Sequence, residues 1–178
     1  SIIIDADDAI WVTGELRHGG PESLTFTRFP GLPDSRFLQV SCHYQHALAV
    51  TTDGGLFSRG SGHCGELGHG SREDDDVLRK VLALEDVPIA SAAAGSRTSF
   101  ALARSGEMWS WGDGLGLGHG GNAQSQQLLP KVIEGLPAGT RIRRFAAGVE
   151  SVVCELGDDS LWSWGEIADS KASPSRLT

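Results

Sequence analysis

Short apolar runs alternate with polar turns along the chain, and the same order returns about every 50 residues. The runs 48–50, 100–102 and 152–154 are each followed by a turn-forming pair and then by a second run that contains aromatic residues. The turn-forming pairs are Asp53-Gly54, Ser105-Gly106 and Asp158-Asp159. An Asp-Gly pair between two such runs is among the strongest local signals for a β-hairpin. The pattern therefore predicts three β-hairpins.

The hairpins belong to a repeat that aligns without gaps over 18 residues. Its three copies are "HYQHALAVTTDGGLFSRG" (43–60), "GSRTSFALARSGEMWSWG" (95–112) and "GVESVVCELGDDSLWSWG" (148–165). The opening "SIIIDADDAIWVTG" (1–14) fits the same columns and lacks only the first four positions. The glycines that end the four segments are 46, 52 and 53 residues apart, and they are Gly14, Gly60, Gly112 and Gly165. A fixed period of this length indicates a repeat architecture.

The tryptophans fall in two columns of this alignment. Trp109 and Trp111 are two residues apart, as are Trp162 and Trp164, and Trp11 shares the column of Trp109. Residues i and i+2 of a β-strand point to the same face. We therefore expect these aromatic side chains to pack between neighbouring repeats.

Each hairpin has further short strands on both sides. An apolar run precedes it, and a glycine loop such as "GELGHG" (65–70) or "GLGLGHG" (114–120) follows, then another short run such as 128–137. Four short strands per repeat, with no long helix, are typical of a β-propeller blade. The predicted fold class is all-β, with blades of four antiparallel strands. Within one propeller domain, we expect a partial first repeat and connector at 1–35, repeats at 36–88 and 89–140, and a partial last repeat at 141–178.

The segments "QHALAVTTDGGLFSRGSGHCGELGHG" and "TSFALARSGEMWSWGDGLGLGHG" carry a family resemblance. They resemble the regulator of chromosome condensation repeat, which runs approximately G-x-x-H-(S/T)-x-x-L, an Asp-Gly hairpin, (Y/W)-x-W-G and G-x-L-G-(H/L)-G. The resemblance covers essentially the whole chain. Its histidine is kept as His46 but becomes Thr98 and Ser151, its first glycine is His43 in the first full repeat, and after Gly165 the glycine loop is lost.

The resemblance implies a ring of about seven blades. This chain supplies about three to three and a half of them. An open arc would leave the inner faces and strand edges of its end blades exposed to water, which natural proteins avoid. We therefore expect the remaining blades to come from a longer chain, from a second chain or from a second copy.

Composition narrows the function classes. The formal net charge is −8, with 39% hydrophobic and 21% charged residues, so a folded acidic protein is expected and direct nucleic-acid binding is disfavoured. The tight group Arg141, Arg143 and Arg144 is equally consistent with capping a blade edge and with touching RNA. Three cysteines without framework spacing predict free thiols in a reducing intracellular compartment. No apolar run approaches the ~20 residues of a membrane span, and no targeting peptide is recognisable.

The glycine loops and histidines are interpreted as structural. A phosphate cradle needs a strand before it and a helix after it, which "GHGSRED" and "GHGGNAQ" do not provide. The structural signature of the repeat is Gly60, Gly68, Gly70, Gly112, Gly118, Gly120, Gly165, Trp109, Trp111, Trp162, Trp164 and His46. The group Cys42, His43, His46, His63, Cys64 and His69 fits zinc spacing only loosely, and no catalytic pair has a third orienting residue. We expect no metal, no cofactor and no catalytic residue.

The acidic run Glu73, Asp74, Asp75 and Asp76 follows the glycine loop of the first full repeat. It is either a solvated loop or a contact for a basic partner. The favoured function is a non-catalytic interaction scaffold within a larger assembly. The alternative implied by the resemblance is guanine-nucleotide exchange on a small GTPase, for which this stretch offers no insertion that could act as a wedge.

Overall fold

The structure, a computed structural model, describes residues 2–6, 10–12, 27–28, 36–120, 126–166 and 171–177. These residues form four antiparallel sheets, which we call blades 1 to 4, and in each sheet the strands are paired in chain order. Blade 1 contains β1 (Ile2–Ile4), β2 (Ile10–Val12) and β3 (Thr27–Arg28). Blade 2 contains β4 (Phe37–His43), β5 (His46–Thr51), β6 (Leu56–Gly60) and β7 (Asp75–Lys80). Blade 3 contains β8 (Ile89–Ala94), β9 (Thr98–Ala103), β10 (Met108–Asp113) and β11 (Gln126–Val132). Blade 4 contains β12 (Ile142–Ala147), β13 (Ser151–Leu156), β14 (Leu161–Gly165) and β15 (Lys171–Arg176).

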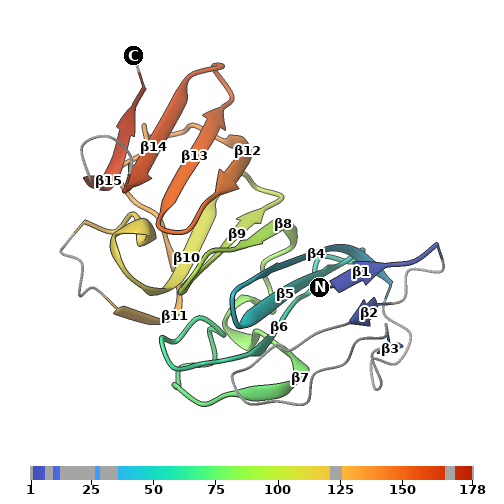
Figure 1. The fold of residues 1–178 in the computed structure, drawn as a ribbon. Coiled ribbons are helices and arrows are strands. Elements are labelled where there is room, and N and C mark those ends of the chain that lie inside the picture. The colour runs from blue at the N-terminus through green and yellow to red at the C-terminus, as the bar shows by residue number, and fades with distance from the viewer. Residues whose placement is uncertain are drawn as a thin grey trace.

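The blades follow one another along an arc (Figure 1). The first strands β1, β4, β8 and β12 are neighbours along this arc, and the fourth strands β7, β11 and β15 lie at its periphery. Helical structure in the described part of the chain is limited to two short 3₁₀ turns, η1 (Leu82–Leu84) and η2 (Leu115–Leu117). The prediction of four-stranded propeller blades is confirmed. No helix among the described residues is long and apolar enough to cross a membrane.

Blade 4 has a fourth strand although its glycine loop is lost from the sequence. β15 pairs with β14, with Lys171 opposite Gly165 and Ser175 opposite Ser163. Gln127 and Lys131 of β11 lie opposite the corresponding residues Gly112 and Ser110 in blade 3. The strand pairing of the repeat therefore survives the loss of the loop sequence.

The hydrophobic core is divided among the contacts between neighbouring blades. One cluster of buried side chains joins blades 1 and 2, a second joins blades 2 and 3, and a third joins blades 3 and 4. Trp111 is fully buried against blade 2, and Trp164 is buried against blade 3 in the same way. Trp109 and Trp162 lie partly buried at the edges of the same two clusters. The aromatic columns therefore pack between blades.

A hydrogen bond fastens each of these buried indoles to the glycine corner of the preceding blade. Trp111 Nε1 donates to the carbonyl oxygen of Glu66 at 2.8 Å, and Trp164 Nε1 donates to the carbonyl oxygen of Gly116 at 2.8 Å. Gly68 and Gly118 lie flat against the same rings, with φ of +75° and +76°. A Cβ on either glycine would come within 2.9 or 2.7 Å of the indole nitrogen. We call this arrangement, a glycine corner closed on the next blade's tryptophan, the indole latch.

The glycines that end the aligned segments allow a close backbone approach. A Cβ on Gly60, Gly112 or Gly165 would lie 2.2, 2.2 or 2.0 Å from a backbone carbonyl oxygen across the hairpin. Their φ angles are +110°, +108° and +89°, a region that residues other than glycine rarely adopt. The Gly70 and Gly120 amides donate to Leu128 and Ala172 on the outer strand of the following blade, at 3.1 and 2.9 Å.

His46 strengthens the latch between blades 2 and 3. The Ser99 hydroxyl donates to the Glu66 carbonyl oxygen at 2.7 Å, so His46 Nε2 donates to Ser99 Oγ at 2.9 Å. Between blades 3 and 4 the corresponding residues are Thr98 and Val152, which cannot form this chain. Thr98 Oγ1 is buried there without a hydrogen-bond partner. The latch between blades 3 and 4 therefore keeps the Trp164 indole bond without the hydrogen-bonded histidine and serine.

Candidate interaction surface

The turn between β4 and β5 projects an exposed aromatic side chain. Tyr44 is 77% exposed and adopts φ of +48°, in the left-handed region. The corresponding turns of blades 3 and 4 carry Ser96 and Val149, and neither has a positive φ. An aromatic residue in this conformation is uncommon outside strained turns. Its exposed ring makes Tyr44 the first element of a candidate site.

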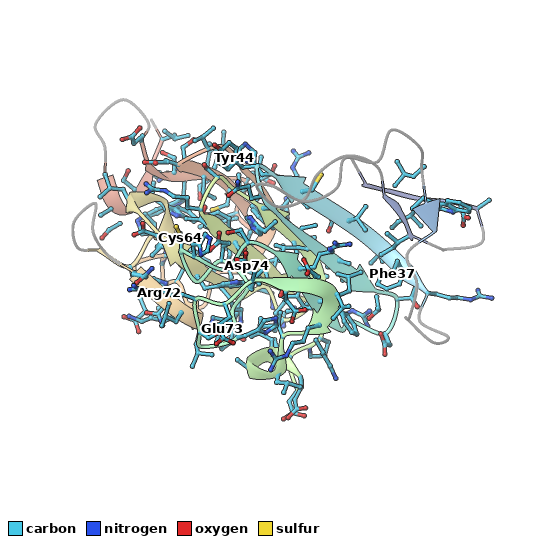
Figure 2. All side chains as sticks on the ribbon, turned by 60° about the horizontal axis from the view of Figure 1, so that its bottom comes forward. Phe37, Tyr44, Cys64, Arg72, Glu73 and Asp74 are labelled. Atoms are coloured by element: carbon cyan, nitrogen blue, oxygen red, sulfur yellow. The ribbon has the colours of Figure 1, made fainter. Side chains whose placement is uncertain are left out.

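The Tyr44 turn is continuous with the loops that carry the acidic run. The Ser61 amide donates to the Gln45 carbonyl oxygen at 2.8 Å, and the next amide, of Gly62, donates to Asp74 Oδ1 at 3.0 Å. The His63 ring lies 3.8 Å from the same carboxylate. Figure 2 shows Cys64, Asp74, Arg72 and Glu73 near one another, with Phe37 apart from them toward blade 1. We call the turn 44–45 together with the loops 61–64 and 72–74 the tip surface.

The acidic run is divided between this loop and β7. Glu73 and Asp74 precede the strand and are exposed, whereas Asp75 and Asp76 are its first two residues. Asp75 lies 3.9 Å from Arg79, and Asp76 also has an interaction within the chain. Asp74 accepts from Gly62 and lies near His63, so the acidic side chain most available to a partner at the tip surface is that of Glu73, next to the exposed Arg72.

Neighbouring charges on the next turn are already paired. Arg97, at the turn between β8 and β9, lies 3.4 Å from Asp113 and 3.2 Å from Glu150. This arginine therefore neutralises part of the negative charge of the two carboxylates beside it. Sequence reasoning did not single out Tyr44 or Arg97, because the sign of a φ angle and the pairing of charges between blades are properties of the folded chain.

The histidines and cysteines of the first full repeat do not converge. His46 is buried against Ser99, and burial together with the nearby His43 lowers its pKa to about 3. His69 Nε2 lies 3.1 Å from Ser58 Oγ at the glycine corner, and His119 Nε2 lies 2.9 Å from Ser110 Oγ at the next corner. Burial lowers the pKa of both corner histidines.

All three cysteines, Cys42, Cys64 and Cys154, are free. Burial raises the pKa of the Cys64 thiol, and nearby carboxylates, first that of Glu66, raise it further. Burial also raises the pKa of Cys154 to about 11. In the part of the chain that the structure describes, no three His, Cys, Asp or Glu side chains are grouped as metal ligands.

The arginine group 141–144 lies on the edge strand of blade 4. A bulge between Ile142 and Arg144 interrupts the alternation, so Arg143 and Arg144 are both exposed. Arg143 pairs with Asp159, and Arg144 Nη2 lies 2.5 Å from Glu155 Oε2. Both arginines have carboxylate partners within the blade.

The sequence and the fold of this chain are similar to those of known proteins. The regulator of chromosome condensation (RCC1) repeat matches residues 53–102 and 105–154. The E3 ubiquitin-protein ligase HERC2 of Homo sapiens is 32% identical over 177 residues, which cover 92% of this chain and 4% of HERC2. The structure of human WBSCR16 superposes with a TM-score of 0.87 at 21% identity, over 99% of this chain and 50% of that protein. The structure of Saccharomyces cerevisiae Prp20p, characterised for its binding to Gsp1p and histones, superposes with a TM-score of 0.78 at 18% identity, over 99% of this chain and 49% of that protein. This chain thus spans about half of the solved propellers that it matches and a small part of HERC2. The matched repeats, the four-stranded blades and the indole latches together show that the chain belongs to the regulator of chromosome condensation (RCC1) repeat family.

Proposed function

We propose that this chain is part of a non-catalytic interaction propeller whose tip surface docks a basic segment of a partner protein. The observation that carries the proposal is Tyr44, an aromatic residue held exposed at φ of +48° on a turn that hydrogen bonds connect to the loop of the acidic run. A left-handed conformation costs about 1–2 kcal/mol for a residue other than glycine. Because the ring is 77% exposed, little packing within the chain offsets this cost. Strain of this kind is often kept at binding sites.

The charge of the surface favours a basic partner. Glu73 is exposed in the loop that is connected to the Tyr44 turn through Asp74 and Gly62, and the formal net charge of the chain is −8. A lysine or arginine of a partner can stack on the face of a tyrosine ring while it is attracted by nearby carboxylates. Complementary charge also speeds the encounter of two proteins. An acidic surface with one exposed aromatic anchor therefore suits an extended basic segment.

The ring itself requires further blades. The four blades of the described residues form an open arc (Figure 1), and the chain covers about half of the solved structures that it matches. We infer that the outward faces of blades 1 and 4 are covered by blades from the same or another chain. The partner of the tip surface would then bind a closed, rigid ring.

A capture experiment on the whole protein that contains this chain tests the docking proposal. The immobilised protein is compared with a Tyr44→Asn, Glu73→Lys variant, and bound proteins are quantified by mass spectrometry at rising salt concentration. We expect proteins with basic segments to bind the unmodified protein, to elute as salt rises, and to fall at least about tenfold with the variant. Asn tolerates a positive φ, so the variant should fold at least as well as the original protein.

Glu134→Lys is the matched control, because it reverses an exposed acidic residue on the rim of blade 3. Equal capture by all three proteins would refute the tip surface as the docking site. A panel of small GTPases loaded with fluorescent GDP tests the alternative. Accelerated release of GDP would favour nucleotide exchange over a passive scaffold.

A further inference from the structure

A small cavity opens on the outer rim between blades 2 and 3. Its volume is about 80 Å³. It lies where the glycine corner and outer strand of blade 2 meet β11 of blade 3. The residues that line it are Gly68, His69, Arg79, Leu82, Ala83 and Leu129. We call this cavity the rim notch, and it is separate from the tip surface.

Two leucines of the rim notch are exposed to solvent. Leu82 is 59% exposed and Leu129 is 47% exposed, and they come from different blades. Single exposed leucines are common on protein surfaces and need no explanation. Two that line one cavity across a blade boundary raise the question of whether the architecture requires them.

The next blade boundary answers this question, because the repeat provides a corresponding corner. The Val81 amide bonds to β6 as the Ile133 amide bonds to β10, so Leu82 corresponds to Glu134. The Gly70 and Gly120 amides bond to Leu128 and Ala172, so Leu129 corresponds to Ser173. These backbone hydrogen bonds set the register of the two corners.

The corner between blades 3 and 4 therefore folds with a glutamate and a serine at the two leucine positions. Neither leucine is needed to build a glycine corner. The leucines make the rim notch apolar where the repeat allows polar residues. Exposed apolar side chains that line a cavity where the repeat allows polar residues can serve as a contact for a partner.

The size of the notch restricts what can enter it. A volume of about 80 Å³ is that of roughly three waters in the liquid. An apolar cavity of about 150 Å³ holds benzene, so this smaller space suits a branched aliphatic side chain better than an indole. The apolar lining favours the same choice, because a polar group would lose its hydration without gaining a partner.

One cationic group borders the notch. Among the lining residues, Arg79 alone carries a permanent charge, since His69 is held neutral by a pKa that burial lowers. The Arg79 side chain is 57% exposed, and its ion-pair partner Asp75 is 3.9 Å away, near the limit of a direct contact. Its guanidinium therefore has donors left for a second carboxylate.

We propose that the rim notch is a second docking site, which takes a branched aliphatic side chain of a partner segment while a carboxylate of the same segment binds Arg79. The segment is aliphatic and acidic, opposite in charge to the partner of the tip surface. This site depends only on the contact between blades 2 and 3, so it stands whether or not the tip surface binds a partner.

N-acetyl-L-leucine is a suitable probe, because it combines an isobutyl group with one carboxylate. Saturation-transfer NMR on the whole protein follows the probe's methyl signals, with N-acetyl-L-leucinamide and N-acetyl-L-tryptophan for comparison. We expect weak, saturable binding of the leucine acid, weaker binding of the amide and none of the tryptophan derivative at this site.

Two variants locate the binding. Leu82→Glu with Leu129→Ser installs the residues of the corner between blades 3 and 4, so it should fold and lose the methyl signal. Arg79→Gln should lower the affinity for the acid by up to about fivefold and leave that for the amide unchanged. An unchanged signal in the double variant, or an equal preference for acid and amide in the unmodified protein, would overturn the proposal.

Discussion

At the scale of single residues, His46 shows how a side chain of this repeat changes its character on burial. It is completely enclosed, its Nε2 is used by Ser99, and its pKa falls to about 3 because burial disfavours the imidazolium. The sequence predicted a structural histidine from its column. It could not supply the partner, because Ser99 lies 53 residues away and belongs to the next blade.

The lowered pKa makes stability depend on pH. Unfolded His46 binds a proton below about pH 6.5, whereas the folded residue does so only near pH 3. The unfolded state therefore binds more protons in this interval. The contribution of His46 to the free energy of unfolding is complete above pH 6.5 and falls as the pH drops toward 3. We expect His46→Gln, which keeps a donor for Ser99, to reduce the slope of this loss.

Urea unfolding at pH 7.5 and pH 5 measures the effect. His63→Gln, at a largely exposed position, is the control and should keep the slope of the unmodified protein. His69 and His119 also have lowered pKa values, so part of the slope will remain. An unaltered slope in His46→Gln would mean that His46 is not the group responsible.

At the scale of elements, the indole latch explains why a glycine is needed beside the tryptophan at each corner. Gly68 combines φ of +75° with a close approach of the Trp111 ring, whose Nε1 would lie 2.9 Å from an added Cβ. The chain also contains Gly139, at φ of +76°, where an added Cβ would have no atom within 4 Å. Alanine substitutions at Gly139 and Gly68 therefore distinguish the free-energy cost of the backbone conformation from the cost of crowding against the ring.

Gly139→Ala should lower the free energy of unfolding by about 1–2 kcal/mol, the cost of a left-handed alanine. Gly68→Ala should lose this amount and about 1–3 kcal/mol more, because the methyl group pushes the Trp111 ring off the Glu66 carbonyl. Chemical denaturation of the two variants measures the difference. Equal losses would show that the ring moves freely and that the latch contributes little.

Most of the strands and turns could be predicted from the sequence. The hairpins and the aromatic columns were predicted because apolar period, turn residues and repeat spacing all indicated the same strands. The acceptors of the latch were not, because they are the backbone carbonyls of Glu66 and Gly116, which no side-chain pattern marks. The rim notch was likewise missed, although comparing Leu82 with Glu134 in register would have indicated it.

At the scale of the whole molecule, blade 4 ends the arc with a face like those that are covered elsewhere. Val153 and Leu161 stand in the columns of Phe100 and Met108, which are buried between blades 3 and 4. In blade 4 these residues border an open cavity of about 230 Å³, and Leu161 is 46% exposed. Glu155 stands in the column of Leu102 and pairs with Arg144. The face has the apolar floor of a blade contact and a charged rim.

If a further blade covers this face, Leu161 is buried in the whole protein. Leu161→Ala should then cost about 2–3 kcal/mol of the free energy of unfolding, as core truncations do. Val77→Ala, at an exposed position of β7, should stay within about 0.5 kcal/mol. Thermal or urea unfolding of the whole protein compares the two, and similar small losses would indicate that the face of blade 4 is not covered.

Because the two latches differ, blade 4 should separate from the arc more readily than blades 2 and 3 separate from each other. In the latch between blades 2 and 3, His46, Ser99 and the Trp111 indole all form hydrogen bonds, whereas in the latch between blades 3 and 4 the Trp164 indole bond lies beside an unpaired Thr98 hydroxyl. In a repeat protein each blade is stabilised chiefly by its neighbours, so the boundary with fewer bonds separates first. Amide protons of blade 4 would exchange with solvent earlier than those of blades 2 and 3, which would stay together as one cooperative unit. Two substituted columns, His46 to Thr98 and Ser99 to Val152, would thereby divide a regular arc into a firm pair and a more readily released blade.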